Sequence, residues 1–251
     1  MIMGSNETIR LGTWSRESIS ELLASLGDGS VGSKIGVISG AFLGTPYEQA
    51  TLMGSAEIEE CVVVNLAGLD CFTFLDYVEA MRRSNSFDEF VCRVKEVRYR
   101  SGVVSYRTRN HFFTDWIEQN GAYVTDVTGD IGGNDVRTVR KHLNRRHDGT
   151  AYVPDITPFD RDVTYLPINA LFGAVHRLQI GDYLGVYSPF EGLDVSHTGI
   201  VVEVQGGLAL RHASSREGAR RVVDQDLMNY LVDKPGMIIL RPHEAAPLLP
   251  L

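Results

Sequence analysis

The chain has 251 residues, of which 43% are hydrophobic and 22% are charged, and 24 Lys and Arg against 32 Asp and Glu give a formal net charge of −8. This composition predicts a globular protein with a sizeable core and excludes wholesale disorder. The acidic balance argues against a general nucleic-acid binder, which needs a dominant basic surface. No apolar run is long enough to span a bilayer, and residues 1–10 carry neither the basic nor the apolar segment of a secretory signal.

Apolar periodicity predicts helices in the first part of the chain. Within 71–83, Cys71, Phe74 and Val78 recur at the spacing of one helical face, and Asp70 is a favourable N-cap. The segments expected to be helical are 15–26, 33–43, 71–83 and 86–98, with a short β-branched strand at 61–64.

The pattern changes in the last third of the chain, where short apolar runs between turn residues predict strands. The basic stretch 140–147 before them, which includes His142 and His147, is expected to form a solvated face. No repeat or linker divides the chain, so the sequence predicts one α+β domain over residues 1–251, with N-terminal helices packed on an antiparallel sheet. The expected strands are 182–187, 195–204, 208–213 and 237–240, with a helix at 224–231.

Cys71 is the first candidate for a reactive residue. Its position in the first turn of a predicted helix places it beside unpaired N–H groups and the helix dipole, which stabilise a thiolate and lower the thiol pKa. The alternative is a small, inert core residue, as free cysteines usually are. Cys61 and Cys92 lack this position, and three cysteines do not form a disulfide framework.

Two histidines on neighbouring predicted strands, His197 and His212, are candidate partners of Cys71. A hairpin centred on 204–205 would place them opposite each other, whereas a tight turn at 206–207 would separate them along the strands but keep them on one face. We therefore expect that their contact requires a four-residue loop or a bulge. The alternative is that each histidine is a structural hydrogen-bonding residue.

Polar and aromatic side chains alternate in the segment 108–116. One interpretation is a capped helix start with a packed tryptophan, and the other is the wall of a cleft for a polar substrate, formed by Arg109, Asn110 and His111. The planar guanidinium of Arg109 suits a carboxylate. The chain has no HExxH, His-x-Glu or CxxC spacing, so neither a metal nor another cofactor is expected.

Seven short motifs follow one another along most of the chain. They are 42–47, 65–74 around Leu69-Asp70-Cys71, 109–111 with 115–116, 164–167, 181–182, 197–200 and 212–215. In this order they resemble the NlpC-type papain-like cell-wall hydrolases and, more closely, the N-acetylmuramoyl-L-alanine amidase-like family of that superfamily.

The resemblance implies a papain-like (NlpC-type) α+β fold with a catalytic triad. Cys71 is then the nucleophile, His197 the general base and His212 the residue that orients the imidazole, while the Cys71 backbone N–H helps to form an oxyanion hole. The expected substrate contacts are Tyr47, Asp70, Arg109, Asn110, His111 and Tyr165. The implied partners are peptidoglycan fragments (muropeptides). The family implies the cell envelope or periplasm as the place of action if a signal segment has been removed, and otherwise the cytoplasm is expected.

Phe72 departs from the typical NlpC-type pattern, in which an Asp-Cys-Ser sequence helps to hold a free peptide amine. We therefore expect hydrolysis of the amide between N-acetylmuramic acid and L-Ala. The alternatives are an endopeptidase that cleaves between D-Glu and the diamino acid, and a non-catalytic wall-binding module. A thiolate–imidazolium pair of Cys71 and His197 would give a bell-shaped dependence of kcat/KM on pH and rapid alkylation of Cys71 below neutral pH.

Overall fold

The computed structural model describes residues 7–244, so the expectation about a secretory signal lies mostly outside the described residues. The α-helices are α1 (Arg16–Ser25), α2 (Val31–Ala41), α3 (Cys71–Arg82), α4 (Phe87–Arg98), α5 (Phe113–Asn120), α6 (Thr128–Gly132), α7 (Ile168–Ala174) and α8 (Leu227–Leu231). The strands are β1 (Glu7–Arg10), β2 (Val62–Asn65), β3 (Val124–Asp126), β4 (Arg137–Leu143), β5 (Phe159–Pro167), β6 (Tyr183–Tyr187), β7 (Val195–Val204), β8 (Gly207–Ser214), β9 (Arg221–Asp226) and β10 (Gly236–Pro242).

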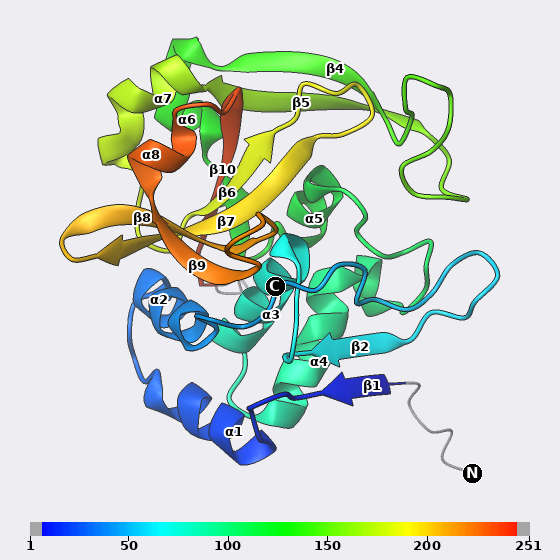
Figure 1. The fold of residues 1–251 in the computed structure, drawn as a ribbon, viewed down its shortest axis with the longest axis vertical. Coiled ribbons are helices and arrows are strands. Elements are labelled where there is room, and N and C mark those ends of the chain that lie inside the picture. The colour runs from blue at the N-terminus through cyan, green and yellow to red at the C-terminus, as the bar shows by residue number, and fades with distance from the viewer. Residues whose placement is uncertain (1–6, 245–251) are drawn as a thin grey trace, which may run out of the picture.

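The main sheet has the strand order β4-β5-β10-β6-β7-β8-β9, with β3 also paired to β10, and its pairs are antiparallel (Figure 1). The short strands β1 and β2 form a separate parallel pair. Helices α1 to α4 lie on one side of the sheet, and α6, α7 and α8 lie on the other (Figure 1). The expected α+β class with N-terminal helices and an antiparallel sheet is therefore confirmed.

Alternate residues of the central strands are buried on the two faces of the sheet. Ile200 and Val202 of β7 belong to the core shared with the N-terminal helices. Val201 belongs to a second core with Leu171 of α7 and Leu231 of α8. Because both faces are covered, β6 and residues 200–202 of β7 are continuous apolar runs apart from Gly185, and such runs made these strands predictable from the sequence.

The basic stretch 140–147 differs from the expectation of a solvated face. Its first residues belong to β4, and strand alternation turns Lys141 into the interior, where it is 2% exposed. The Lys141 ammonium donates hydrogen bonds to the backbone carbonyls of Ser188 (2.6 Å), Phe190 (2.6 Å) and Leu193 (2.9 Å). The expectation was therefore wrong for Lys141, whose charge fixes the loop between β6 and β7.

The ends of two elements also bear on the site. Asp70 caps α3 by accepting hydrogen bonds from the backbone N–H groups of Phe72 (3.0 Å) and Thr73 (2.8 Å), as its N-cap position predicted. The expected helix at 224–231 is wrong in its first residues, because β9 continues to Asp226 before α8 begins. Residues 7–244 contain no helix with the length and hydropathy needed to cross a bilayer.

Candidate active site

Cys71 and His197 line the same cavity of about 180 Å³, although they are 126 positions apart in the chain. Cys71 begins α3, and His197 lies near the start of β7. The hydroxyl of Thr198 donates a hydrogen bond of 2.8 Å to the Cys71 carbonyl, which holds the start of α3 against β7. The fold therefore brings together the two residues that the sequence predicted as nucleophile and base.

His212 contacts His197 because β7 and β8 pair in a register that differs from both expected hairpins. The strands β7 and β8 pair Ile200 with Arg211 and Val204 with Gly207, so the turn is the two residues 205–206. Gln205 and Gly206 have φ values of 51° and 80°, as the mirror-image turns of tight hairpins require. Both expected turn positions were wrong by one residue.

His197 and His212 are consequently diagonal neighbours on one face of the hairpin, not opposite residues. Nε2 of His197 lies 2.8 Å from Nδ1 of His212, a hydrogen-bond distance. The prediction that the two histidines share a face is confirmed. The prediction that contact needs a four-residue loop or a bulge between β7 and β8 was wrong, because diagonal side chains on neighbouring strands are within reach of each other.

The contact between the histidines determines which nitrogen of His197 remains free. Because Nε2 of His197 faces His212, Nδ1 is the ring nitrogen left without a hydrogen-bond partner among residues 7–244. The other ring nitrogen of His212, Nε2, is buried without a hydrogen-bond partner among residues 7–244. Tyr230 of α8 packs on both rings, with centroid distances of 5.1 Å to His212 and 6.4 Å to His197. The pair is thus enclosed and fixed in orientation.

Burial favours the neutral forms of both members of the expected ion pair. Burial, and secondly the charge of Asp70, raise the pKa of the Cys71 thiol to about 11. Burial lowers the pKa of His197 to about 3 and that of His212 to about 4. The helix start was expected to lower the thiol pKa, and desolvation outweighs that effect here.

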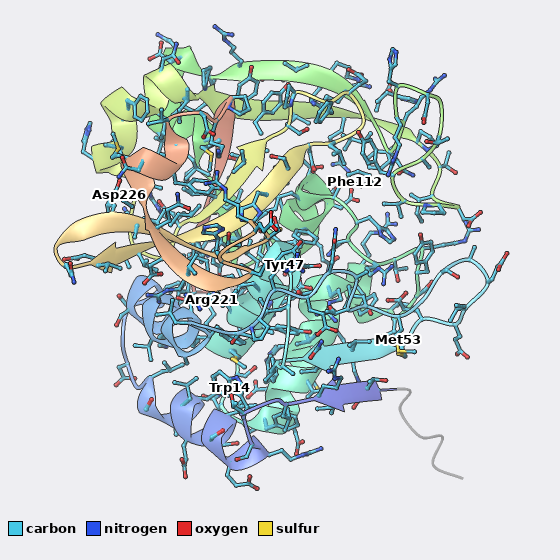
Figure 2. All side chains as sticks on the ribbon, in the orientation of Figure 1. Trp14, Tyr47, Met53, Phe112, Arg221 and Asp226 are labelled. Carbon is cyan, nitrogen blue, oxygen red and sulfur yellow. The ribbon has the colours of Figure 1, made fainter. Side chains whose placement is uncertain are left out.

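Tyr47 lies beside the catalytic candidates. Its backbone N–H donates to the carbonyl of Arg220 (2.9 Å), and Pro46 bridges to Arg221 at the start of β9, next to which Tyr47 is seen (Figure 2). Burial, and secondly the Cys71 and Asp70 charges, raise the pKa of the Tyr47 phenol. Tyr47 is not among the residues that line the cavity, so its role as a substrate contact stays a prediction.

Cations surround this side of the site, although the chain is acidic overall. The Arg220 guanidinium lies 5.4 Å from the Tyr47 ring centroid, and the Lys234 ammonium lies 5.0 Å from that of Tyr230. Lys234 and Arg216, after burial and His212, contribute to the low pKa of His197. Four residues near the site were not expected from the sequence, because nothing in a single sequence shows that their segments return to Cys71: Arg216, Arg220, Tyr230 and Lys234.

The segment 108–116 is divided between the cavity and the interior. His111 lines the cavity, and its Nε2 lies 2.7 Å from the Tyr106 carbonyl, so this nitrogen carries the proton and donates. Burial lowers the pKa of His111 to about 4. Phe112 and Phe113 also line the cavity, and the Phe113 ring packs edge-on against Phe72, with the centroids 6.4 Å apart. This wall is therefore mainly aromatic, with one neutral imidazole.

Three expected substrate contacts make structural contacts instead. Arg109 forms an ion pair with the buried carboxylate of Glu60 at 3.0 Å. Asn110 is 3% exposed, and its amide donates to the Val97 carbonyl at 3.0 Å. Tyr165 stacks on Tyr187 in the core, with ring centroids 3.7 Å apart. The structure does not place these three side chains among the residues that line the cavity.

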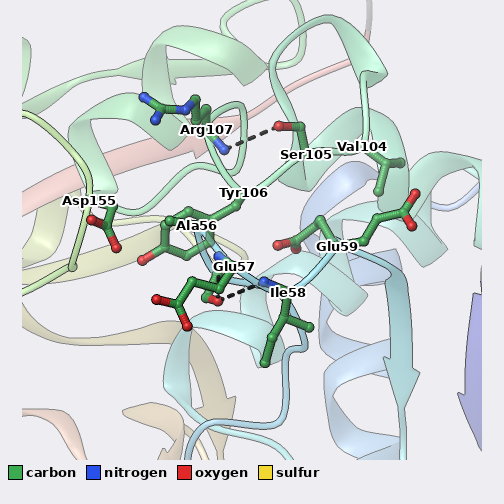
Figure 3. A pocket seen from close by; sticks show the side chains of 11 residues that line it. Ala56, Glu57, Ile58, Glu59, Val104, Ser105, Tyr106, Arg107 and Asp155 are labelled. Atoms are coloured by element: carbon green, nitrogen blue, oxygen red, sulfur yellow. Dashed lines mark hydrogen bonds between the residues drawn. The ribbon is translucent and has the colours of Figure 1, made fainter.

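Glu60 lines a separate hollow of about 370 Å³ (Figure 3). Tyr106, Asp155 and Glu57 are among its lining residues (Figure 3). Its several carboxylates disfavour an acidic ligand, so this hollow is a poor extension of the site for the expected substrate. Within residues 7–244 there is no group of three or more His, Cys, Asp or Glu side chains arranged to hold a metal ion.

Comparison with known proteins gives the family. The model of the N-acetylmuramoyl-L-alanine amidase-like family matches residues 37–237, and the chain belongs to this family. Among curated proteins no match was found.

Solved structures share the fold over most of the chain. A Legionella pneumophila protein of the family DUF1460 is 24% identical, with a TM-score of 0.77 over 93% of this chain and 96% of that chain. An N-acetylmuramoyl-L-alanine amidase from Bacteroides uniformis is 26% identical, with a TM-score of 0.70 over 85% of this chain and 99% of that chain. The fold is thus that of the amidase-like structures, and the relationship to the amidase is distant.

Proposed function

We propose that this protein is an N-acetylmuramoyl-L-alanine amidase that hydrolyses the amide between N-acetylmuramic acid and L-Ala in muropeptides, with a single papain-like domain formed by residues 1–251. The observation that carries the proposal is the chain of contacts from the cavity inward. Cys71 and His197 share the cavity, and His197 is held by His212 at 2.8 Å. A wall-binding module has no need of this arrangement.

Acyl transfer in this site begins from a neutral thiol and a neutral imidazole. Nδ1 of His197 accepts the Cys71 proton as the sulfur attacks the amide carbon, and the developing imidazolium is stabilised by His212. His197 then gives the proton to the leaving amine of L-Ala, which leaves a muramyl thioester on Cys71. Water, deprotonated by His197, hydrolyses the thioester to the lactyl carboxylate and restores the thiol.

The start of α3 supports an oxyanion hole at Cys71. The Asp70 cap uses the N–H groups of Phe72 and Thr73, and the first residue of a helix has no intrahelical acceptor for its own N–H. The Cys71 N–H is therefore free to donate to the oxyanion that forms on the attacked carbonyl.

The surroundings of Cys71 favour a muramyl acyl group and an acidic leaving peptide. The cavity wall of Phe72, Phe113 and His111 carries no net charge and suits the uncharged sugar with its acetamido group. Arg220 and Arg216 on the side of Tyr47 suit the carboxylates of the stem peptide, the role that the sequence analysis gave to Arg109. Phe72 occupies the position at which a serine would help to hold a free amine.

The test compares N-acetylmuramyl-tripeptide with the same tripeptide lacking the sugar, with the products identified by mass spectrometry. We expect the muramyl substrate to release an intact tripeptide and the free tripeptide to remain uncut. If the free tripeptide is cut between D-Glu and its third residue while the muramyl amide survives, the protein is the endopeptidase instead.

A further inference from the structure

A basic groove of about 810 Å³ lies outside the candidate active site. One wall is the segment after β4, with Arg145, Arg146, His147 and Tyr152, and the other is the loop between β6 and β7, with Phe190. The backbone N–H of Asn144 donates to the Gly192 carbonyl at 2.9 Å, so the two segments lie side by side. The groove includes part of the basic stretch 140–147, which has no role in the proposed reaction.

The cations of the groove are available to a ligand. Arg145, Arg146 and His147 are exposed and form no ion pair within residues 7–244, while Glu191, the carboxylate among the lining residues, accepts a hydrogen bond of 3.0 Å from the backbone N–H of His142. By contrast, Arg140 of β4, the strand that precedes this segment, forms ion pairs with Asp160 (3.4 Å) and Asp162 (3.1 Å). Unpaired cations on a concave surface of an acidic protein favour an anionic ligand.

Aromatic side chains accompany these cations. The Arg146 guanidinium lies 4.5 Å from the centroid of the Tyr152 ring, and the Phe190 side chain is 64% exposed. A flat apolar surface beside a guanidinium fits a ring that carries a carboxylate, such as an acidic sugar.

Buried polar contacts fix both walls of the groove. Asn144 is fully buried at a φ of 68°, and its side chain bonds to the backbone of Val153 (2.7 and 2.9 Å) and Ile156 (2.7 Å). The loop on the opposite wall is held by the three carbonyl contacts of Lys141. A site that is rigid before binding loses little entropy when its ligand arrives.

The groove and the catalytic cavity share one loop. Phe190 lines the groove, whereas Leu193 and Asp194 of the same loop line the cavity next to His197. A polymeric ligand that follows this loop would contact both places.

We propose that the basic groove binds the free lactyl carboxylate of a neighbouring sugar repeat, so that the substrate is a glycan strand of several repeats. This inference rests on the proposed function, because hydrolysis of the muramyl amide converts each lactyl amide into a carboxylate. Each turnover on a strand therefore creates an anion that Arg145 and Arg146 can hold while the next amide reaches Cys71.

Binding is measured by titration calorimetry with the peptide-free disaccharide of N-acetylglucosamine and N-acetylmuramic acid, on protein whose Cys71 has been alkylated to fill the catalytic cavity. We expect binding that added salt weakens, and that the double substitution Arg145→Gln and Arg146→Gln weakens by roughly tenfold or more. Arg137→Gln, which removes an exposed charge of β4 outside the groove, is the matched control and should leave the affinity unchanged.

Equal binding by the double variant, or equal binding of the neutral N-acetylglucosamine disaccharide, would overturn the proposal. Hydrolysis of single-repeat N-acetylmuramyl-tripeptide by the double variant separates the two claims. We expect its rate to match that of the unmodified protein, with a lower kcat/KM only on strands of several repeats. If no muramyl amide is cut by either protein, the proposed function fails, while the titration still decides whether the groove binds the acidic sugar.

Discussion

Two regions contain candidate site residues in the sequence, the site of Cys71, His197 and His212 and the segment 108–116. They differ in how many of their polar side chains form structural hydrogen bonds or ion pairs in the folded protein. Cys71, His197 and His212 come from distant segments, and within residues 7–244 Nδ1 of His197 has no hydrogen-bond partner at the cavity that His197 and Cys71 line. In the segment 108–116, Arg109 pairs with Glu60 and the Trp116 indole donates to Asp76 at 3.0 Å. A polar residue is thus a candidate for chemistry only where its polar atoms are not already engaged in structural hydrogen bonds or ion pairs. In the segment 108–116, His111 is the polar residue that lines the cavity.

The largest expected effect in the first region comes from its nucleophile. Cys71→Ala should lower kcat by roughly 10⁴-fold or more, because no other group can form the thioester. Muramyl-tripeptide hydrolysis measures the loss, and circular dichroism checks that the fold is retained. The control is Cys92→Ala, which removes an exposed thiol and should leave the rate unchanged. A fully active Cys71→Ala protein would remove the basis of the comparison.

The histidine pair should show a smaller effect that is graded by role. His197→Gln should lower kcat by roughly 10²–10⁴-fold, because it removes the base. His212→Ala should lower kcat less, with little change in KM, because His212 acts through His197. His212→Asn keeps an acceptor and should recover part of the loss. An increase in KM without loss of kcat in the His212 variants would make His212 a substrate contact.

In the segment 108–116, substitution of Arg109 should affect stability and not activity. Arg109→Gln leaves the carboxylate of Glu60, 2% exposed, without its ion-pair partner and should cost roughly 3–5 kcal/mol of unfolding free energy. The kcat/KM of the folded variant should be unchanged. The double variant with Glu60→Gln should recover part of the stability in urea unfolding. A loss of activity at unchanged stability would return Arg109 to the substrate site.

The dependence on pH distinguishes a neutral pair from an ion pair. With the pKa of His197 near 3 and that of Cys71 near 11, kcat/KM should stay level through neutral pH and fall only in acid, once the imidazole is protonated. The free energy of unfolding should begin to fall at a higher pH than kcat/KM does, as the pH drops below about 6.5. Below that pH the histidines of the unfolded chain, with a pKa of about 6.5, take up protons, whereas the buried histidines of the folded protein do not. A bell centred near neutral pH would favour the thiolate–imidazolium pair that the helix start predicted.

The charge of Asp70 should give the smallest effect. Asp70→Asn keeps a capping acceptor but removes the anion beside Cys71, so the thiol pKa should fall and alkylation by iodoacetamide should become severalfold faster. Cys92, exposed on α4, serves as the internal reference in the same protein. An unchanged rate would mean that burial alone sets the thiol pKa.

The elements that carry the histidines could be predicted, whereas the edges of the sheet could not. Strands β6 to β8 contain short apolar runs and α3 has a capping box, so the sequence pattern was strong. Strand β4 consists largely of charged and polar residues, and α6 has five residues, too few for a periodic pattern.

The sequence predicted that His197 and His212 lie on the same face of the β7–β8 hairpin, but it did not predict the register in which the two strands pair. Alternation along β7 and β8 fixes the face, while the register depends on Gln205 adopting a positive φ, which is uncommon for a residue other than glycine. The cations at Tyr47 and the ion pair of Arg109 are long-range contacts, and no spacing along the chain reports them.

The most direct test of the account is the identity of the acyl group on Cys71. Rapid acid quenching during turnover of N-acetylmuramyl-tripeptide, followed by peptide mass spectrometry, should find N-acetylmuramic acid in thioester linkage on the Cys71 peptide and no adduct on the peptides of Cys61 or Cys92. An L-Ala–D-Glu adduct on Cys71, or turnover with no adduct on it under conditions in which the thioester is stable, would contradict the account.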